Sequence, residues 1–295
     1  MSFINRLRLA KDWFLWIAKG LLKQLNCNPM PEKAFKKFNI RLVDGSIVNE
    51  PGVTGSSWRI HYSLRLSDLH CDTFLITTTK TGESLQRYPI VKNDLIIGDR
   101  GYCRRKGIVH VLENHGHVLV RFHSTSLPLF NRRGKSLSVL SLLRSLADVT
   151  LGDFDVWFKD PNNGSLIKGR ILALRKSKGA IAIALRKLHK YASKKGVKLK
   201  PDTLEYAEYF IQFTTLNRHK FKAEELLNLY RCRWQIELLF KRLKSLMGVG
   251  HLPMQNELSS KAWLYGKMVI ALITECVHQE AEFYFPWGYS ISCLT

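Results

Sequence analysis

Four residues with chemically capable side chains recur at helical spacing late in the chain: Tyr230, Arg233, Glu237 and Lys244. At roughly 100° per residue, these offsets fall within an arc of about 60° on a helix predicted over residues 222–247. One face of that helix would therefore carry a phenol, a guanidinium, a carboxylate and an ammonium in line, beside an apolar and buried face. The alternative is a helix with ordinary i,i+4 and i,i+7 neighbours on a solvated face.

Two aspartates add further carboxylates, and each follows an apolar segment that predicts a strand. Asp99 comes after Leu95-Ile-Ile-Gly and precedes Arg-Gly-Tyr, and Asp44 ends Arg41-Leu-Val and precedes Gly45. A carboxylate at the end of a buried strand is well placed for a ligand outside the sheet. The alternative is a turn aspartate that bonds to its own backbone.

Carboxylate oxygens suit Mg²⁺. Two such ions a few ångströms apart can activate an attacking oxygen and stabilise a leaving one. The combination of carboxylates and cationic side chains is therefore compatible with phosphodiester chemistry.

The segments around these residues predict an α/β core with an insertion. Strands are expected at 38–43, 58–66, 73–78, 94–98, 117–122 and 209–214, with a hairpin of 153–159 and 166–174. Besides the helix that bears Glu237, helices are expected near 1–25, 103–114 (with Gly116 as its stop), 136–146, 178–195 and 259–283.

The charge balance points to a polyanionic partner. The chain has 46 Lys and Arg against 24 Asp and Glu, a net charge of +22 and a pI near 9.9. Residues 100–200 contain 22 basic and 5 acidic residues, a surplus of 17. Nucleic acid is the favoured partner, and an anionic membrane surface is the competing one.

The cysteines and the hydropathy favour an intracellular setting. Six cysteines occur without a C-x-x-C pair or a zinc-finger spacing, which favours a reducing compartment. No apolar run reaches membrane-spanning length. We therefore expect a cytoplasmic protein with no membrane partner.

Taken together, these motifs resemble a bacterial insertion-sequence DDE transposase of the Y-(2)-R-(3)-E-(6)-K signature subgroup. Asp44 lies in D-G-S, Asp99 lies in G-D-R-G-Y, and the helix supplies the row from Tyr230 to Lys244. The run Trp58-Arg-Ile-His sits where that family has a similar strand. The resemblance covers residues 38–252. It implies an α/β fold with an RNase H-like mixed sheet and flanking helices, interrupted by a basic insertion between the second Asp and the Glu.

The resemblance also implies a catalytic site. Asp44 would bridge two Mg²⁺ ions, for which Mn²⁺ would substitute, and Asp99 and Glu237 would each complete one metal site. Water would first free a 3′-hydroxyl, which would then attack the opposite strand or the target, and similar enzymes form a hairpin on the transposon end. We expect cut-and-paste transposition of an insertion sequence in double-stranded DNA, by a homodimer assembled on DNA at the bacterial nucleoid.

Five residues are expected to contact the DNA. Arg233 and Lys244 would hold phosphates, and Tyr230 would hydrogen-bond to one. Arg121 is a further candidate in a strand near the core. Tyr209 would stack on a base flipped out beside the cleavage point, as an aromatic residue does in similar transposases.

Two of these expectations have explicit alternatives. Tyr209 could simply pack its strand, and Trp157 on the hairpin is a rival base acceptor. The cations of the helix over residues 178–195 could bind the DNA backbone or could be merely solvated.

The expected organisation has five parts. They are an N-terminal helical region (1–37), the first part of the catalytic core (38–123), the basic insertion (124–208), the rest of the core (209–252) and a C-terminal helical region (253–295). The first part is short for the family, so a shortened reading frame is one interpretation. A non-catalytic DNA-binding derivative and a plain RNase H-like nuclease are the competing functions.

Overall fold

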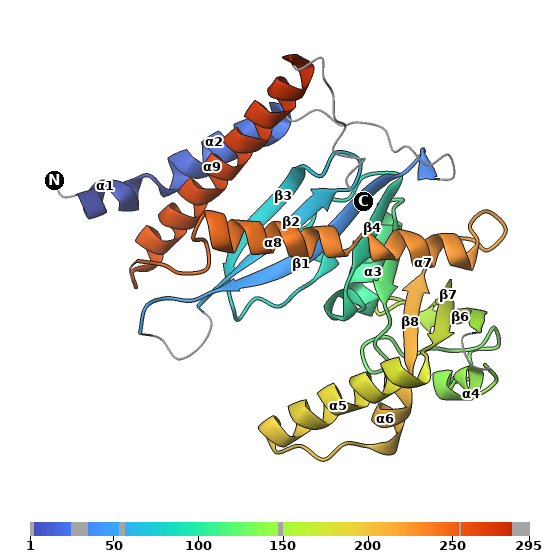
Figure 1. Cartoon of the computed structure of the whole chain (residues 1–295). Helices are drawn as coiled ribbons and strands as arrows, with labels where there is room; N and C mark the ends of the chain where they lie inside the picture. Colours follow the sequence, from blue (N-terminus) through green and yellow to red (C-terminus); the bar gives the residue numbers. More distant parts are fainter. Residues whose placement is uncertain (1–2, 25–34, 53–56, 147–149, 254, 285–295) are drawn as a thin grey trace. The chain divides into compact units, whose positions relative to one another are not determined.

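The computed structural model describes residues 3–24, 35–52, 57–146, 150–253 and 255–284. Hydrogen bonding orders its strands β3-β2-β1-β4-β5-β8-β7-β6 in one mixed sheet with flanking helices (Figure 1). This is the α/β mixed sheet with flanking helices that the sequence predicts. Contacts divide the chain into two units, which are described separately. Unit 1 comprises Met1–Lys36, Arg41–Glu83 and Trp234–Thr295, and unit 2 comprises Lys37–Ile40 and Ser84–Arg233.

An antiparallel meander forms the strand layer of unit 1. It consists of β1 (Asn39–Val48), whose first two residues belong to unit 2, β2 (Trp58–Arg65) and β3 (Cys71–Thr78). The expected strand end and turn at Asp44 are wrong, because β1 continues to Val48 and Gly45 still pairs with His61. The Asp44 carboxylate does accept the Gly45 N–H at 2.8 Å, but this local bond forms within a paired strand.

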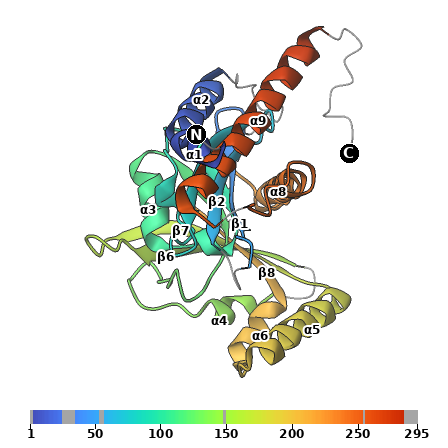
Figure 2. The same ribbon diagram turned by 90° about the vertical axis from the view of Figure 1, so that its left-hand side faces the viewer.

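In the described part of unit 1, four helices accompany these strands. They are α1 (Phe3–Leu9), α2 (Lys11–Gln24), α8 (Trp234–Leu246) and α9 (Glu257–Tyr284). In both views α2 and α9 lie side by side, and Phe14 packs at Gly266 (Figures 1 and 2). Among the described residues, no helix has the combination of length and apolar character needed to span a bilayer.

In unit 2, the strand ends that carry predicted site residues meet at one edge of the sheet. β4 (Asp94–Gly98) and β5 (His117–Arg121) are parallel, so both end at that edge. β8 (Tyr209–Thr214) runs antiparallel to β5 and therefore begins there, and β7 (Leu166–Arg175) ends there. β6 (Leu151–Lys159) completes the expected hairpin with β7.

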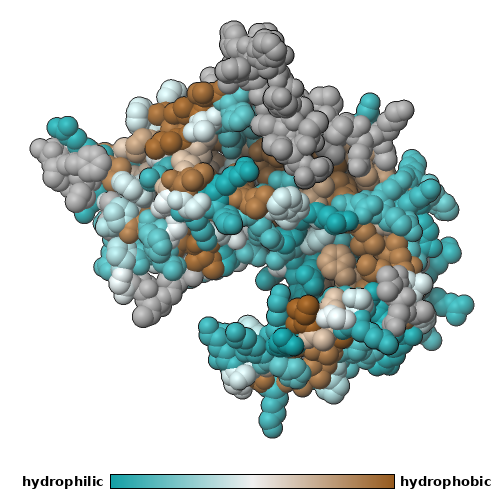
Figure 3. Space-filling view, in the orientation of Figure 1, coloured by the Kyte–Doolittle hydropathy of each residue, from teal (hydrophilic) through white to brown (hydrophobic). Residues whose placement is uncertain are grey.

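Unit 2 also contains short and long helices. They are the 3-10 turns η2 (Leu85–Arg87) and η3 (Arg100–Tyr102) and the helices α3 (Arg105–Glu113), α4 (Val139–Leu143), α5 (Lys178–Lys195), α6 (Pro201–Ala207) and α7 (Ala223–Arg231). The Ser177 side chain caps the start of α5, and Gly196 takes φ 62° at its end. Figure 2 shows α5 beside α6, and the surface of α5 is mostly hydrophilic in Figure 3.

Candidate active site

In unit 1, Asp44 lies on the sheet face that α8 covers. Asp44 is directly opposite Tyr62 in the register of β1 and β2, so both side chains project from the same face. The Tyr62 ring is buried and lies 5.9 Å from the Phe240 ring of α8, centroid to centroid. Glu237 precedes Phe240 by three residues, and residues at this spacing are neighbours on a helix surface. The strand and the helix of unit 1 therefore carry Asp44 and Glu237 toward the same side.

Glu237 and Lys244 both lie on α8 and are exposed. Their separation of seven residues is close to two helical turns, so their side chains point in nearly the same direction. Glu237 lies in the first turn of the helix, where backbone N–H groups favour a carboxylate, and Lys244 lies in the last turn, where a cation is favoured. Both side chains are accessible to a ligand from solution.

In unit 2, Asp99 lies immediately after β4 and is half-buried. Its Oδ1 accepts the N–H of Gly101 at 2.7 Å, so the side chain caps η3. A Cβ at Gly98 would lie 3.1–3.2 Å from the Tyr102 side chain, and glycine therefore allows the turn to fold back against the strand. The aspartate thus has the local bond of a turn residue and also the position at a strand end that the sequence predicts.

Tyr230 is anchored beside Asp99. Its hydroxyl donates a hydrogen bond of 3.2 Å to the carbonyl of Gly98, and its ring lies 5.7 Å from the Phe210 ring. Burial raises the pKa of Tyr230 to about 12, with the Asp99 charge adding to this rise and the positive charges of Arg233 and Arg121 opposing it. The phenol therefore stays protonated at neutral pH and ties the end of α7 to the strand that precedes Asp99.

Arg121 ends β5 in the same region. Its guanidinium lies 5.2 Å from the centre of the Phe210 ring. Burial lowers the pKa of Arg121, and the nearby charges of Arg100 and Arg233 lower it further. Unit 2 thus gathers several cations around Asp99.

Tyr209 is buried, with 5% of its surface exposed. The Arg175 guanidinium lies 6.0 Å from its ring centre. Phe210, the next residue, is half-buried and contacts both Arg121 and Tyr230. Stacking of a base on Tyr209 would therefore require this residue to be uncovered first.

The single helix predicted over residues 222–247 is wrong. Helix α7 ends at Arg231, where Cys232 donates its N–H to the Leu229 carbonyl and Arg233 donates its own to the Tyr230 carbonyl. These bonds close tighter i→i−3 turns, and α8 begins only at Trp234. The common arc therefore does not extend from Tyr230 to Lys244. Tyr230 and Arg233 belong to unit 2, whereas Glu237 and Lys244 belong to unit 1.

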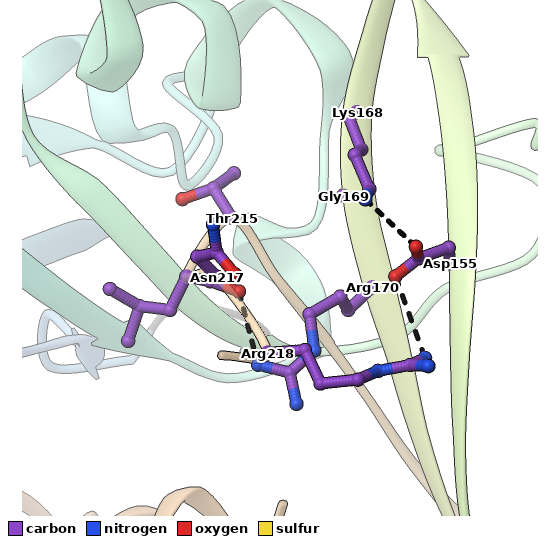
Figure 4. A pocket seen from close by; sticks show the side chains of 8 residues that line it. Asp155, Lys168, Gly169, Arg170, Thr215, Asn217 and Arg218 are labelled. Carbon is purple, nitrogen blue, oxygen red and sulfur yellow. Dashed lines mark hydrogen bonds and ion pairs between the residues drawn. The ribbon is translucent and has the colours of Figure 1, made fainter. Parts of the chain in front are cut away.

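The cavity drawn in Figure 4 is less suited to chemistry. It is lined by Asp155, Lys168, Arg170, Arg218 and the segment 215–217 of unit 2. Its charges are paired with one another: Asp155 with Lys168 at 2.8 Å and with Arg218 at 3.5 Å. Arg170 is buried and donates to the Asp153 carboxylate and to two carbonyls. These contacts stabilise the hairpin and the loop after β8.

The donor chemistry of Asp44, Asp99 and Glu237 fits a divalent cation, because all three offer hard carboxylate oxygens. Asp44 and Glu237 lie in unit 1 and Asp99 lies in unit 2. Within the part of the chain that the structure describes, no group of three or more His, Cys, Asp or Glu side chains gathers around one point.

Sequence reasoning missed three residues at the edge of unit 2: Arg100, Lys176 and Phe210. Arg100 follows Asp99, Lys176 follows β7, and Phe210 is the second residue of β8. No local sequence pattern marks them, although each lies at the edge of the sheet where the parallel strands end. Only the strand order brings these three segments to one edge.

One family model and two relatives that agree with it match this chain. The family model described as Transposase DDE domain matches residues 75–273, more than half of the chain, including Asp99 and Glu237 but not Asp44. The transposase for insertion sequence element IS421 of Escherichia coli is 27% identical over 283 residues, which cover 95% of this chain and 76% of that protein. InsL of insertion sequence element IS186A, from Escherichia coli strain K12, matches with the same identity and coverage.

Two solved structures have partial likeness to the chain. A piggyBac transposase synaptic complex with hairpin DNA has a TM-score of 0.44 and 13% identity, covering 82% of this chain and 47% of that one. The catalytic domain of human endonuclease V has a TM-score of 0.32 and 11% identity, covering 78% and 95%.

Proposed function

The chain belongs to the Transposase DDE domain family, and on this premise we propose that Asp44, Asp99 and Glu237 carry its cutting and joining of insertion-sequence DNA. Members of this family generally use divalent metal ions, and transposases act on DNA. The observation that most supports the assignment is the placement of Asp44 and Glu237 on one side of unit 1, by β1 and α8. The position of Asp99 directly after β4 is in keeping with the same role.

Asp44, Asp99 and Glu237 would hold two Mg²⁺ or Mn²⁺ ions through their carboxylate oxygens. When bound, such ions activate an attacking oxygen and stabilise a leaving one. The protein supplies fixed oxygen ligands. Asp99 is held by the Gly101 N–H, and Asp44 is held by the Gly45 N–H.

The proposed reaction has two phosphoryl transfers at one site. First, the oxygen of water attacks the scissile phosphorus, the bond to the 3′ oxygen breaks, and the products are a 3′-hydroxyl and a 5′-phosphate. Second, that 3′-hydroxyl attacks a phosphorus of the opposite strand or the target. A new phosphodiester bond then forms as another 3′ oxygen leaves and takes up a proton.

Cationic side chains would position the strands for both steps. Lys244 is exposed on α8, and Arg233 lies at the end of unit 2 beside Tyr230. We assign both to backbone phosphates. Arg121 at the end of β5 would do the same for unit 2. The single proton of the Tyr230 hydroxyl is donated to Gly98, so contact with a phosphate would require Tyr230 to exchange that partner.

The larger organisation is also proposed. Residues 38–123 and 209–252 would form the catalytic core around a basic insertion (124–208), with helical regions at 1–37 and 253–295. A homodimer would assemble on the double-stranded transposon ends, at the nucleoid. Tyr209 would receive a flipped base only after it is uncovered.

The test is cleavage of a plasmid that carries the DNA flanking this reading frame, in the presence of Mg²⁺. We expect Asp44→Asn, Asp99→Asn and Glu237→Gln to abolish strand cleavage while DNA affinity is retained, since phosphate contacts by Lys and Arg supply most of it. Glu113→Gln is the matched control, because Glu113 is an exposed helical carboxylate on α3.

The possible outcomes separate the competing functions. Near-normal cleavage by a folded carboxylate variant would remove that residue from the site. DNA binding by the wild type without any cleavage would favour a non-catalytic derivative. Hydrolysis without joining to a target strand would favour a plain nuclease.

A further inference from the structure

Three cations meet at the edge of unit 2 where β4, β5 and β7 end. Arg100 follows Asp99 at the end of β4, Arg121 ends β5, and Lys176 follows β7. The register joins these ends through β8, because Arg121 is opposite Gln212 and Arg175 is opposite Tyr209. Ligands of open α/β sheets bind outside the carboxyl ends of the strands. The three cations thus lie where a ligand would be expected.

Two of these cations occupy an environment that is unfavourable for positive charge. Arg121 and Lys176 are half-buried. Burial lowers the pKa of each, Arg100 lowers both further, and Arg121 adds to the effect on Lys176, while Tyr230 and Asp99 oppose the lowering for Arg121 alone. Among the described residues, Arg100, Arg121 and Lys176 form no ion pair with a carboxylate. Partial burial of clustered like charges destabilises a fold unless an anion compensates them.

The side chains are held in place rather than loosely arranged. The Arg121 guanidinium lies over the Phe210 ring, and Phe210 is in turn held by Tyr230. The Lys176 ammonium donates to the carbonyl of Ala207, which leaves its other two protons for an acceptor. Such preorganisation lowers the entropic cost of binding a ligand.

A buried amide lies in the same row of side chains. Gln212 is fully buried, and within the described residues neither its amide oxygen nor its amide nitrogen has a hydrogen-bond partner. Because Gln212 is directly opposite Arg121, its side chain projects from the same face. An unpartnered buried amide destabilises the fold, so this face keeps a polar group that the fold itself does not use.

We propose that Arg100, Arg121 and Lys176 form a phosphate clamp, which holds one backbone phosphate of the DNA strand that passes Asp99. The phosphate brings negative charge to these side chains, and two guanidiniums and an ammonium offer it donors from three strand ends. The clamp rests on the proposed function for the identity of its ligand. It adds Arg100 and Lys176 to the DNA contacts and gives Arg121 a defined partner group.

The experiment measures binding of the full chain to a fluorescein-labelled DNA duplex over a series of KCl concentrations. EDTA is present throughout, so that no cleavage interferes. The variants are Arg100→Gln and Lys176→Gln, with Lys176→Arg as the conservative exchange. Lys92→Gln is the matched control, because Lys92 is exposed just before β4, at the opposite end of that strand, and its loss changes the net charge equally.

We expect the slope of log affinity against log salt to fall in magnitude by about 0.9 for each lost phosphate contact. Arg100→Gln and Lys176→Gln should show this fall, whereas Lys176→Arg and Lys92→Gln should retain the wild-type slope. Arg100 is exposed, so its variant should fold even if Lys176→Gln does not, and thermal melting checks both.

Slopes in Arg100→Gln and Lys176→Gln equal to that of Lys92→Gln would overturn the clamp, as would a wild-type chain that does not bind the duplex. Cleavage is assayed separately with Mg²⁺. A wild type that binds with the predicted slopes but never cleaves would contradict the proposed catalysis and leave the clamp standing.

Discussion

Replacing one half-buried carboxylate, Glu275→Gln, should stabilise the protein above neutral pH and change it little in acid. Glu275 lies on α9, and its Oε1 accepts a hydrogen bond of 3.3 Å from the Tyr62 hydroxyl. Its Oε2 accepts the Cys71 N–H at 3.1 Å. Burial raises the pKa of Glu275 from 4.5 to about 7, the Asp68 charge adds to this, and the two hydrogen bonds and Arg65 oppose it.

The magnitude follows from linkage. The folded chain binds the Glu275 proton more tightly than the unfolded chain, so between pH 4.5 and about 7 it carries more protons. The free energy of unfolding therefore falls as the pH rises through this window, and the stabilisation present below pH 4.5 is lost above 7. A shift from 4.5 to about 7, at 1.36 kcal/mol per pKa unit, amounts to about 3 kcal/mol.

Glutamine removes the charge while keeping both contacts. Its amide oxygen can accept the Cys71 N–H, and its NH₂ group can donate to the Tyr62 oxygen. Urea unfolding of the full chain at about pH 8 should therefore show Glu275→Gln to be more stable than the wild type by up to about 3 kcal/mol. At about pH 5 the difference should shrink below about 1 kcal/mol.

The matched control is Glu257→Gln on the same helix, where the carboxylate is exposed and paired with Lys261. This variant should gain no stability at alkaline pH. A wild-type stability that is flat between acid and alkaline conditions would refute the reasoning. Lower stability of Glu275→Gln than of the wild type at about pH 8 would also refute the reasoning, because removing the charge would then cost stability.

Three other outcomes are expected. Arg233→Ala and Lys244→Ala should each reduce the salt slope of DNA binding by about 0.9, and unchanged slopes would place both side chains in solvent. Excess EDTA should remove all strand cleavage, Mn²⁺ should restore it, and Ca²⁺ should support assembly with little chemistry; full activity in EDTA would contradict a metal-dependent reaction. With 2-aminopurine beside the cleavage point, Tyr209→Ala should abolish the fluorescence change if Tyr209 receives the flipped base, whereas loss only in Trp157→Ala would assign that role to Trp157.

The elements that the sequence predicted most closely have strong local signals. The bounds of β4, β8 and α5 coincide with those expected. A short apolar run between polar residues defines β4, and a serine cap and a terminal glycine define α5. These signals act within a few residues, so no knowledge of the rest of the fold was needed.

The two wrong boundaries depended on interactions that are remote in sequence. Asp44-Gly45 has the composition of a turn, yet pairing with β2 keeps the segment extended, and a Cβ at Gly45 would lie 3.0 Å from the Glu83 carboxylate. The break between α7 and α8 involves no proline or glycine. It coincides with the boundary between the two contact units, which no local pattern marks.

Of the phosphate clamp, the sequence indicated only Arg121 and missed Arg100 and Lys176. Its members come from segments around residues 100, 121 and 176, and no periodicity relates them. Only the order β4-β5-β8-β7 brings their strand ends to one edge.

The break between α7 and α8 also changes how the Tyr-Arg-Glu-Lys spacing should be interpreted. On one continuous helix the spacing would place four side chains on a single face. In the structure, Tyr230 bonds to the strand end that precedes Asp99, within unit 2. Glu237 lies in the first turn of α8, which packs on the Asp44 face through Phe240, within unit 1. The spacing therefore connects two segments that belong to different units. The first holds Tyr230 against the strand end before Asp99, and the second carries Glu237 on the helix that packs on the Asp44 face. The peptide bond between Arg233 and Trp234 joins the two segments.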